Sequence, residues 1–317
     1  MKVARYVGGG RVEIVQEALP TCPPGGLIVQ TEACGLCSGE LMAWYMDRKI
    51  PHVLGHEVAG IVSASGDARF PVGSRVFPHH HAPCLACEAC LAGHHVHCAQ
   101  WRSTRLAPGA MAEAFAVGAD NLTDTLRVDD LRAVDAALVE PLACVVKSMR
   151  AAHLFPGATV GVVGLGVMGL MHMLMMPGAV GYDSNPQRVA WSKSQGLDGR
   201  SPEDKEQADV LFVCPGSQPA FDLAFSMAKP GASIVMFAPM PEGQSLRVPQ
   251  EAYFLDIKIA HSYSSGPTDT AAAVQALREG RVRAEQVVSH FIGIDELPEA
   301  YLAMKEGRIL KPMVVFQ

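Results

Sequence analysis

The segment TVGVVGLGVMG (159–169) decides the fold of the second half of this 317-residue chain. The apolar run TVGVVG indicates a buried parallel strand, and the VMGLMHMLMM that follows indicates a buried helix. Gly164, Gly166 and Gly169 stand between them in GxGxxG spacing. The first glycine permits a tight turn, the second lets a pyrophosphate approach the backbone, and the third allows the helix to pack closely on the strand. The segment therefore predicts a strand–turn–helix unit that binds a dinucleotide at the helix N-terminus.

The residues after this unit support a dinucleotide site. The next strand candidate, AVGYD, ends in Asp183, 19 residues after Gly164. An acid that binds the ribose hydroxyls is expected about 20 residues after the first glycine. A carboxylate at this position repels a 2′-phosphate, so we expect NAD rather than NADP. Arg188, five residues further on, is included among the expected cofactor-binding residues.

The rest of this region has a strand–helix rhythm. We expect a helix in SNPQRVAWSKSQG, capped by Asn185 and ended by Gly196. Two further buried strands, ADVLFVC and ASIVMFA, flank the helical segment PAFDLAFSMAKPG. The first helix is expected to be short, because only seven residues separate Gly169 from Pro177.

Composition limits the function classes. With 49% hydrophobic and 18% charged residues, the chain has enough apolar content for a large core, and its length suggests two domains. The net charge of −6 and the lack of a basic run argue against a nucleic-acid partner. The uncharged stretch 155–182 is long enough to cross a bilayer, but glycines and Pro177 interrupt it. With no export signal in MKVARYVGGG, we expect a cytoplasmic protein without a membrane partner.

Four cysteines stand close together in HHHAPCLACEACLAGHHVHCAQ (79–100). We expect Cys84, Cys87, Cys90 and Cys98 to bind one structural Zn(II) in a closed tetrahedral shell, which leaves no position for substrate. The six histidines of this stretch are interpreted as surface residues or as residues that contact the metal ligands without binding the metal. A site of chemistry must then lie elsewhere.

A second set of possible ligands comes from three separate segments. Cys37 lies in ACGLCSGE, His56 and Glu57 in VLGHEVAG, and Glu140 in ALVEPLACVV. A thiolate, an imidazole and a carboxylate are the ligands of a catalytic zinc that keeps one position open. A lone His or Glu is more often structural, so this set is informative only as a combination.

These motifs, in this order, resemble the zinc-containing medium-chain alcohol dehydrogenases. The resemblance rests on CGLCSGE, VLGHEVAG, PCLACEACLAGHHVHC, VEPLACV and GLGVMG and extends to GRILKPMVVF, and the Glu-Pro element is most similar to the sorbitol and threonine dehydrogenase branch. It implies a GroES-like catalytic domain (1–148), a Rossmann NAD-binding domain (149–285) and a C-terminal segment (286–317) that completes the first domain. The active site would lie in the cleft between the two domains.

The resemblance also implies an activity and site residues. Cys37, His56 and Glu140 would bind the catalytic zinc, with Glu57 able to exchange with Glu140. The enzyme would transfer a hydride between NAD and a small alcohol or ketone, with a polyol or secondary alcohol as the expected substrate. A homodimer or homotetramer is expected. Two other functions remain open: a zinc-ribbon binding module, and a catalytically silent relative that binds NAD and zinc.

The chain departs from the family pattern where the proton relay begins. Members usually have Ser or Thr two residues after the zinc-binding Cys and several have His three residues later, whereas this chain has Gly39 and Met42. Ser38 is the remaining hydroxyl and is counted as a candidate catalytic residue. Which group carries the proton stays open between Ser38, Glu57 and a water molecule.

Overall fold

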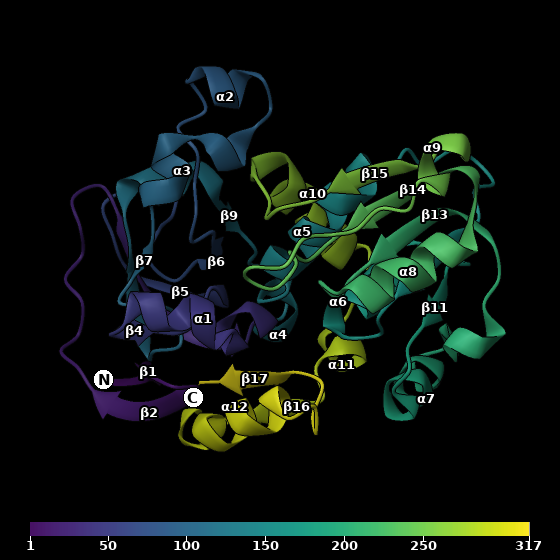
Figure 1. Ribbon diagram of the computed structural model, residues 1–317. Helices are drawn as coiled ribbons and strands as arrows, with labels where there is room; N and C mark the ends of the chain where they lie inside the picture. Colours follow the sequence, from purple (N-terminus) through teal and green to yellow (C-terminus); the bar gives the residue numbers. More distant parts are fainter. Residues whose placement is uncertain (317) are drawn as a thin grey trace. The chain divides into compact units, whose positions relative to one another are not determined.

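The computed structural model describes residues 1–316, and its contacts divide them into two compact units. One unit consists of Met1–Ala143 together with the chain from Ser265 onward, and the other of Cys144–Ser264 (Figure 1). The expected boundaries lie after residues 148 and 285, so the first differs by five residues and the second by 21 residues, which include the whole of α10 (Pro267–Arg278). The reason is that α10 packs on α4 (Ala133–Ala136) of the first unit.

The second unit is built on a six-stranded sheet in which all neighbouring strands are parallel. Its order is β12-β11-β10-β13-β14-β15. The strands are β10 (Val160–Val163), β11 (Val180–Tyr182), β12 (Asp198–Arg200), β13 (Ala208–Val213), β14 (Ala228–Met236) and β15 (Lys258–His261). The chain moves outward from β10 in one direction and then returns to its other side, which is the order of a Rossmann fold. The predicted strand–helix rhythm is thus confirmed.

Alternate residues of these strands supply two separate cores, one on each face of the sheet. Val162, Phe212 and Val235 face one side with Met173 of α6 (Val167–Met175). Val163, Val213 and Ile234 face the other, with Phe221 of α8 (Gln218–Met227). Figure 1 shows α8 lying over β13 and β14. Burial on both faces explains why the strands are apolar throughout.

The helices of this unit follow the sequence signals. α6 has nine residues and ends before Pro177, as the short interval predicted. α7 (Pro186–Ser194) is capped by Asn185, whose side chain accepts a hydrogen bond from Gln187 N, and Gly196 follows with φ +75°. The remaining helical turns are η5 (Pro202–Asp204) and α9 (Glu251–Phe254), while α5 (Val139–Ala151) crosses the division between the units.

The first unit contains two mainly antiparallel sheets. A three-stranded sheet, β2-β1-β4, is formed by β1 (Lys2–Gly8), β2 (Arg11–Gln16) and β4 (His52–Val53). The larger sheet has the path β16-β17-β3-β5-β6-β9, with β8 also paired to β3 and β7 paired to β8. Its strands are β3 (Leu27–Gly35), β5 (Glu57–Ser65), β6 (Arg75–Pro78), β7 (Leu106–Ala107), β8 (Ala114–Val117), β9 (Thr125–Arg127), β16 (His290–Ile292) and β17 (Pro312–Val315).

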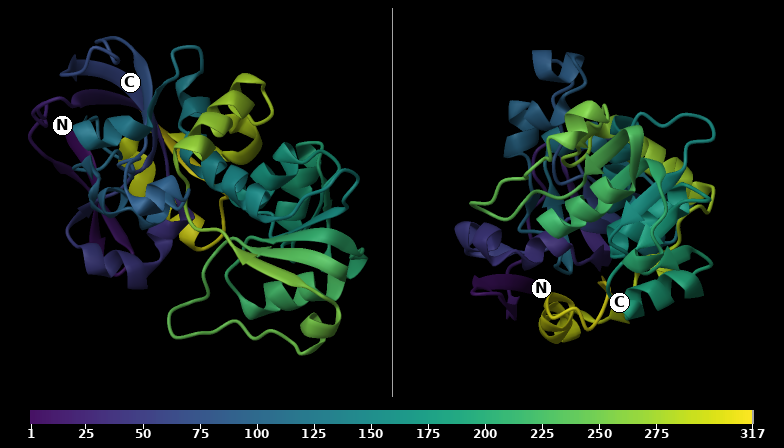
Figure 2. Two further views of the ribbon diagram at one scale, coloured as in Figure 1. Left: turned by 90° about the horizontal axis from the view of Figure 1, so that it is seen from above. Right: turned by 45° about the vertical axis from the view of Figure 1, so that its right-hand side comes forward.

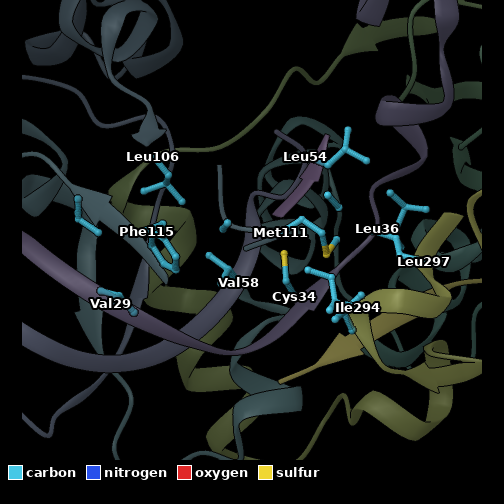
Figure 3. Close-up of a cluster of buried hydrophobic side chains, with 14 of the residues drawn as sticks. Val29, Cys34, Leu36, Leu54, Val58, Leu106, Met111, Phe115, Ile294 and Leu297 are labelled. Carbon is cyan, nitrogen blue, oxygen red and sulfur yellow. The ribbon is translucent and has the colours of Figure 1, made fainter. Parts of the chain in front are cut away.

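The C-terminal segment completes this unit. β17 pairs antiparallel with β3, and α12 (Leu297–Lys305) packs against β2 and β17. This segment, yellow in Figure 2, lies beside the purple N-terminal strands. Ile294 and Leu297 share one apolar core with Leu36 and Cys34 (Figure 3). The last segment of the chain is thus part of the first unit.

Short helices connect the strands of the first unit. They are α1 (Ala43–Met46), α2 (Glu88–Leu91), α3 (Ala99–Ser103), α11 (Ala284–Val287), η1 (Ser38–Leu41), η2 (Asp47–Lys49), η3 (His95–His97), η4 (Ala119–Asp124) and η6 (Ile294–Glu296). Among residues 1–316, no helix has the length and apolar character needed to cross a bilayer. The uncharged stretch 155–182 is divided into β10, α6 and β11.

Gly169 sets how closely α6 crosses β10. A Cβ atom added there would lie 1.8 Å from the backbone oxygen of Gly164, which cannot move away without displacing the turn. We expect Gly169→Ala to destabilise the protein by about 1–3 kcal/mol through overpacking. Thermal unfolding of the full chain measures this. Gly166→Ala is the matched control, because nothing lies within 4 Å of its added Cβ, and an equal loss in both variants would contradict the steric explanation.

Candidate metal and cofactor sites

The four cysteines of the 84–98 segment come together in the first unit. The sulfur atoms of Cys87 and Cys90 lie 3.5 Å apart, those of Cys84 and Cys98 3.6 Å, and those of Cys84 and Cys90 4.0 Å. A tetrahedron of thiolates with Zn–S bonds of about 2.3 Å has sulfur–sulfur edges of about 3.8 Å. All four ligand atoms lie within 4.8 Å of one another, and the cysteines are free thiols. The cluster has the dimensions of a closed zinc site.

The chain around this cluster forms a small core of its own. This core consists of the four cysteines with Val96 and Trp101, and it contains few apolar side chains besides the cysteines. Burial raises the pKa of the Cys98 thiol, but hydrogen bonds from the backbone of Cys84 and Trp101 outweigh it and bring the pKa to about 6. A thiolate is the form that binds metal.

Cys37, His56 and Glu57 form a second cluster in the same unit. Their ligand atoms lie within 4.8 Å of one another. Cys37 caps η1, where its sulfur accepts a hydrogen bond of 3.4 Å from Gly39 N. Glu57 begins β5, directly after His56, and is buried. Two segments of the chain, one with Cys37 and one with His56 and Glu57, thus supply a thiol, an imidazole and a carboxylate to one place.

Glu40 holds two of these ligands in position, a role that sequence reasoning missed. Its carboxylate accepts hydrogen bonds from Cys37 N (3.3 Å) and Gly55 N (2.8 Å). It also lies 3.3 Å from His56 Nδ1. Burial lowers the pKa of His56, but Glu40 and Cys37 raise it well above its ordinary value. The buried carboxylate therefore fixes the imidazole ring and leaves Nε2 for a metal ion.

Lys311 is the second residue that sequence reasoning missed. Its Nζ forms a buried ion pair with Glu57 Oε2 and donates a hydrogen bond of 3.0 Å to Leu36 O. Burial lowers the pKa of Lys311, but Glu57 and Cys37 outweigh it, so the pKa is raised overall. A Cβ atom on Gly35 would lie 2.5 Å from Glu57 Oε2, so this glycine makes room for the pair. The only sequence signal was a single Lys in the apolar run RILKPMVVF.

The structure groups Glu140 with other residues than the sequence suggested. Glu140, in the first turn of α5, has its carboxylate within 4.8 Å of ring nitrogens of His79 and His80, while Glu57 belongs to the Cys37–His56 group. Burial raises the pKa of Glu140. His79 is fully buried and is therefore not a surface residue, whereas His94 and His97 are exposed. Ser38, the candidate relay hydroxyl, is exposed.

The predicted cofactor residues come together at the carboxyl end of β10. Asp183 accepts hydrogen bonds of 2.8 Å from Leu165 N and from Asn185 N, which fix its carboxylate beside the glycine turn. Arg188 Nη1 lies 3.5 Å from Asp183 Oδ2. The open space at Gly166, where α6 begins, is what an approaching pyrophosphate requires.

Comparison with known proteins agrees with this architecture. Residues 23–127 match the model of the alcohol dehydrogenase GroES-like domain. The chain is 28% identical to D-altritol 5-dehydrogenase of Agrobacterium fabrum (strain C58), with 94% of each chain covered. It is 24% identical to probable D-xylulose reductase A of Aspergillus terreus, over 92% of this chain and 91% of that protein.

The fold is shared with solved structures. A putative zinc-binding dehydrogenase from Sinorhizobium meliloti 1021, bound to NADP, superimposes with a TM-score of 0.87 at 23% identity and 99% coverage of both chains. This chain combines a Rossmann-type unit with a GroES-like domain that contains the cluster of Cys37, His56 and Glu57. The chain is thus similar over almost its whole length to dehydrogenases and reductases of polyols and ketoses, and it has an alcohol dehydrogenase GroES-like domain at residues 23–127.

The buried Glu57–Lys311 pair provides a test of the site's framework. Lys311→Met leaves an uncompensated buried carboxylate, and we expect it to destabilise the first unit by about 3–5 kcal/mol. Urea unfolding of the full chain measures this loss. The double variant Glu57→Gln/Lys311→Met removes both charges and should recover part of the stability. A Lys311→Met protein as stable as the unmodified one would show that the pair does not stabilise the fold.

Proposed function

We propose that the protein is a zinc-dependent oxidoreductase that transfers a hydride between NAD and an alcohol, with Cys37, His56 and Glu57 around the catalytic zinc. A second zinc is proposed at Cys84, Cys87, Cys90 and Cys98. The observation that carries the proposal is the meeting of a thiol, an imidazole and a carboxylate within 4.8 Å. A set of three protein ligands leaves a fourth position for substrate.

The residues present fit a zinc ion. Sulfur and imidazole nitrogen are ligands that suit Zn(II), and the buried Glu57 supplies an oxygen. When bound at this site, zinc would act as a Lewis acid that makes a substrate hydroxyl more acidic. A zinc-ribbon module explains only the four-cysteine cluster and leaves the Rossmann unit without a role.

Glu40 and Lys311 control the ligands of the proposed site. Because Glu40 lies beside His56 Nδ1, that nitrogen carries the proton and Nε2 offers its lone pair to the metal. Lys311 competes with a metal ion for the Glu57 carboxylate. Glu57 is therefore a weaker ligand than Cys37 and His56, which suits a ligand that gives way when substrate arrives.

The proton leaving the substrate hydroxyl has no hydroxyl or imidazole acceptor at residues 39 and 42. Gly39 and Met42 carry no such group, and Ser38 is exposed. We infer that a water molecule in the space beside Gly39 receives the proton, since a polar site with room holds an ordered water. Ser38 as the relay remains the alternative.

Asp183 supports NAD as the cofactor. Its carboxylate is fixed by two backbone N–H groups at the glycine turn, where the ribose is expected. The related structure from S. meliloti is bound to NADP, so the family does not decide the cofactor. Arg188 lies beside Asp183 and partly offsets its charge. Gly164, Gly166 and Gly169 would admit the pyrophosphate at the start of α6.

A polyol is the proposed substrate class. The names of two relatives, D-altritol 5-dehydrogenase and D-xylulose reductase, refer to sugar alcohols or their ketoses. We also expect a homo-oligomer and a cytoplasmic location.

The proposed activity is tested with a panel of polyols, secondary alcohols and threonine. Reduction of NAD, followed by NADH absorbance, is expected with at least one polyol. Cys37→Ala should abolish turnover and lower the zinc content by about one equivalent per chain, because it removes a ligand of the catalytic ion only. Cys22→Ala is the control, since Cys22 is exposed and lies outside both clusters. Full turnover in Cys37→Ala would contradict the proposal.

Cofactor preference is tested at Asp183. We expect NADH to bind more tightly than NADPH. Asp183→Asn should reduce this preference about tenfold or more, because the variant loses the charged acceptor for the ribose hydroxyls and the repulsion of the 2′-phosphate. Fluorescence titration with both cofactors measures this. Asp222→Asn, an exposed change in α8, should leave the preference unaltered. Tighter binding of NADPH by the unmodified protein would show that Asp183 does not select the cofactor.

A further inference from the structure

His79, His80 and Glu140 form a metal-competent group beside the Cys37–His56–Glu57 cluster. One ligand atom from each lies within 4.8 Å of the others, and His79 and Glu140 are buried. We propose that these three side chains hold a second divalent cation, next to the one proposed at Cys37 and His56. The proposal goes beyond the proposed function, on which it depends only for the identity of the neighbouring ion.

His79 is built as a metal ligand. Its Nδ1 lies 2.7 Å from Asp124 Oδ2, and the other oxygen of Asp124 accepts a hydrogen bond of 2.6 Å from Thr270 Oγ1. Nδ1 therefore carries the proton, and the lone pair is on Nε2. That atom is fully buried and has no hydrogen-bond partner in residues 1–316. A carboxylate behind a histidine that offers its second nitrogen is the usual arrangement around metal ions.

The backbone fixes His79 in this orientation. His79 follows β6, and its N–H donates to Asp124 O at 3.1 Å, so the main chains of the two residues are also joined. Asn121 Nδ2 donates to His79 O at 2.9 Å. The imidazole is thus held from both backbone and side chain, and its Nε2 has a set direction.

His80 and Glu140 supply the other two ligands. The ring of His80 lies between those of His56 and His81, with centroid distances of 4.7 and 4.1 Å. Its Nδ1 is buried without a hydrogen-bond partner in the described chain. A buried polar atom without a partner is costly, and a metal ion satisfies it. The centroid distance of 4.7 Å between the rings of His56 and His80 places this group next to the Cys37 cluster.

Buried charge favours a second cation. Glu40, Glu57, Glu140 and Asp124 are all buried around these two clusters, and Lys311 is the buried cation paired with one of them. Carboxylates are buried only when cations or hydrogen bonds compensate them. Two imidazoles and a carboxylate, without sulfur, suit zinc, cobalt, iron or manganese.

His79→Asn is the decisive variant. The amide nitrogen of Asn takes the place of Nδ1 and keeps a donor for Asp124, while the atom corresponding to Nε2 is removed. His80→Ala is the second variant, and His94→Ala, an exposed change, is the control. The full chain is loaded with Zn²⁺ or Co²⁺ and freed of excess metal. Metal content and the thiolate-to-Co²⁺ absorption band are measured, with no need for activity.

The unmodified protein should hold about three equivalents of metal per chain, and His79→Asn and His80→Ala about two, with the thiolate band unchanged. Cys37→Ala should also hold about two, but with a weaker thiolate band. Two equivalents in the unmodified protein that persist in His79→Asn would overturn the second site. So would a weaker thiolate band in His79→Asn, because His79 would then serve the Cys37 ion. Failure of the Cys37 site itself would appear separately, as an unchanged band in Cys37→Ala.

Discussion

The pairing of β3 with strands on both of its sides determines the geometry of the Cys37 site. Gly35, near the end of β3, lies opposite Met313 of β17 and also opposite Glu57 of β5. The first pairing brings Lys311 from the end of the chain, and the second brings Glu57 from its first quarter. The ion pair between them crosses over Gly35, where a side chain would collide with it. Cys37 follows two residues later, so the register of three strands fixes the thiol and the carboxylate together.

Two of the three metal-competent groups of the first unit have the same kind of support. A buried carboxylate, Glu40 or Asp124, lies behind a histidine, His56 or His79, at Nδ1. Each carboxylate is itself held, Glu40 by backbone N–H groups and Asp124 by Thr270. Such support sets the tautomer and direction of the ring before a metal arrives, so the site loses little conformational entropy on binding.

The local motifs were readable from the sequence because their geometry lies within a few residues. GxGxxG, the four cysteines and the cap at Asn185 each contain the residues that form them, and all were predicted. The roles of Lys311 and Thr270 were not predicted. Lys311 contacts Glu57 and Thr270 contacts Asp124, and in each pair the two residues are more than 140 positions apart in the sequence. Contacts between distant parts of the sequence also explain why the second unit ends at Ser264 and not at residue 285, as expected. Thr270 lies on α10, whose packing on the first unit has no signal in its own sequence.

The two units differ in what they bury. The second unit buries aliphatic residues on both faces of a parallel sheet, and this apolar burial needs no ligand. The first unit has an apolar core in its strands, but it also buries four carboxylates near its metal-competent side chains. Burial raises the pKa of Glu140, so its ionised form is less favourable than that of an exposed carboxyl group. A bound metal ion removes that cost. Binding of the proposed cation at Glu140 would therefore add to the stability of the first unit, to which that site belongs.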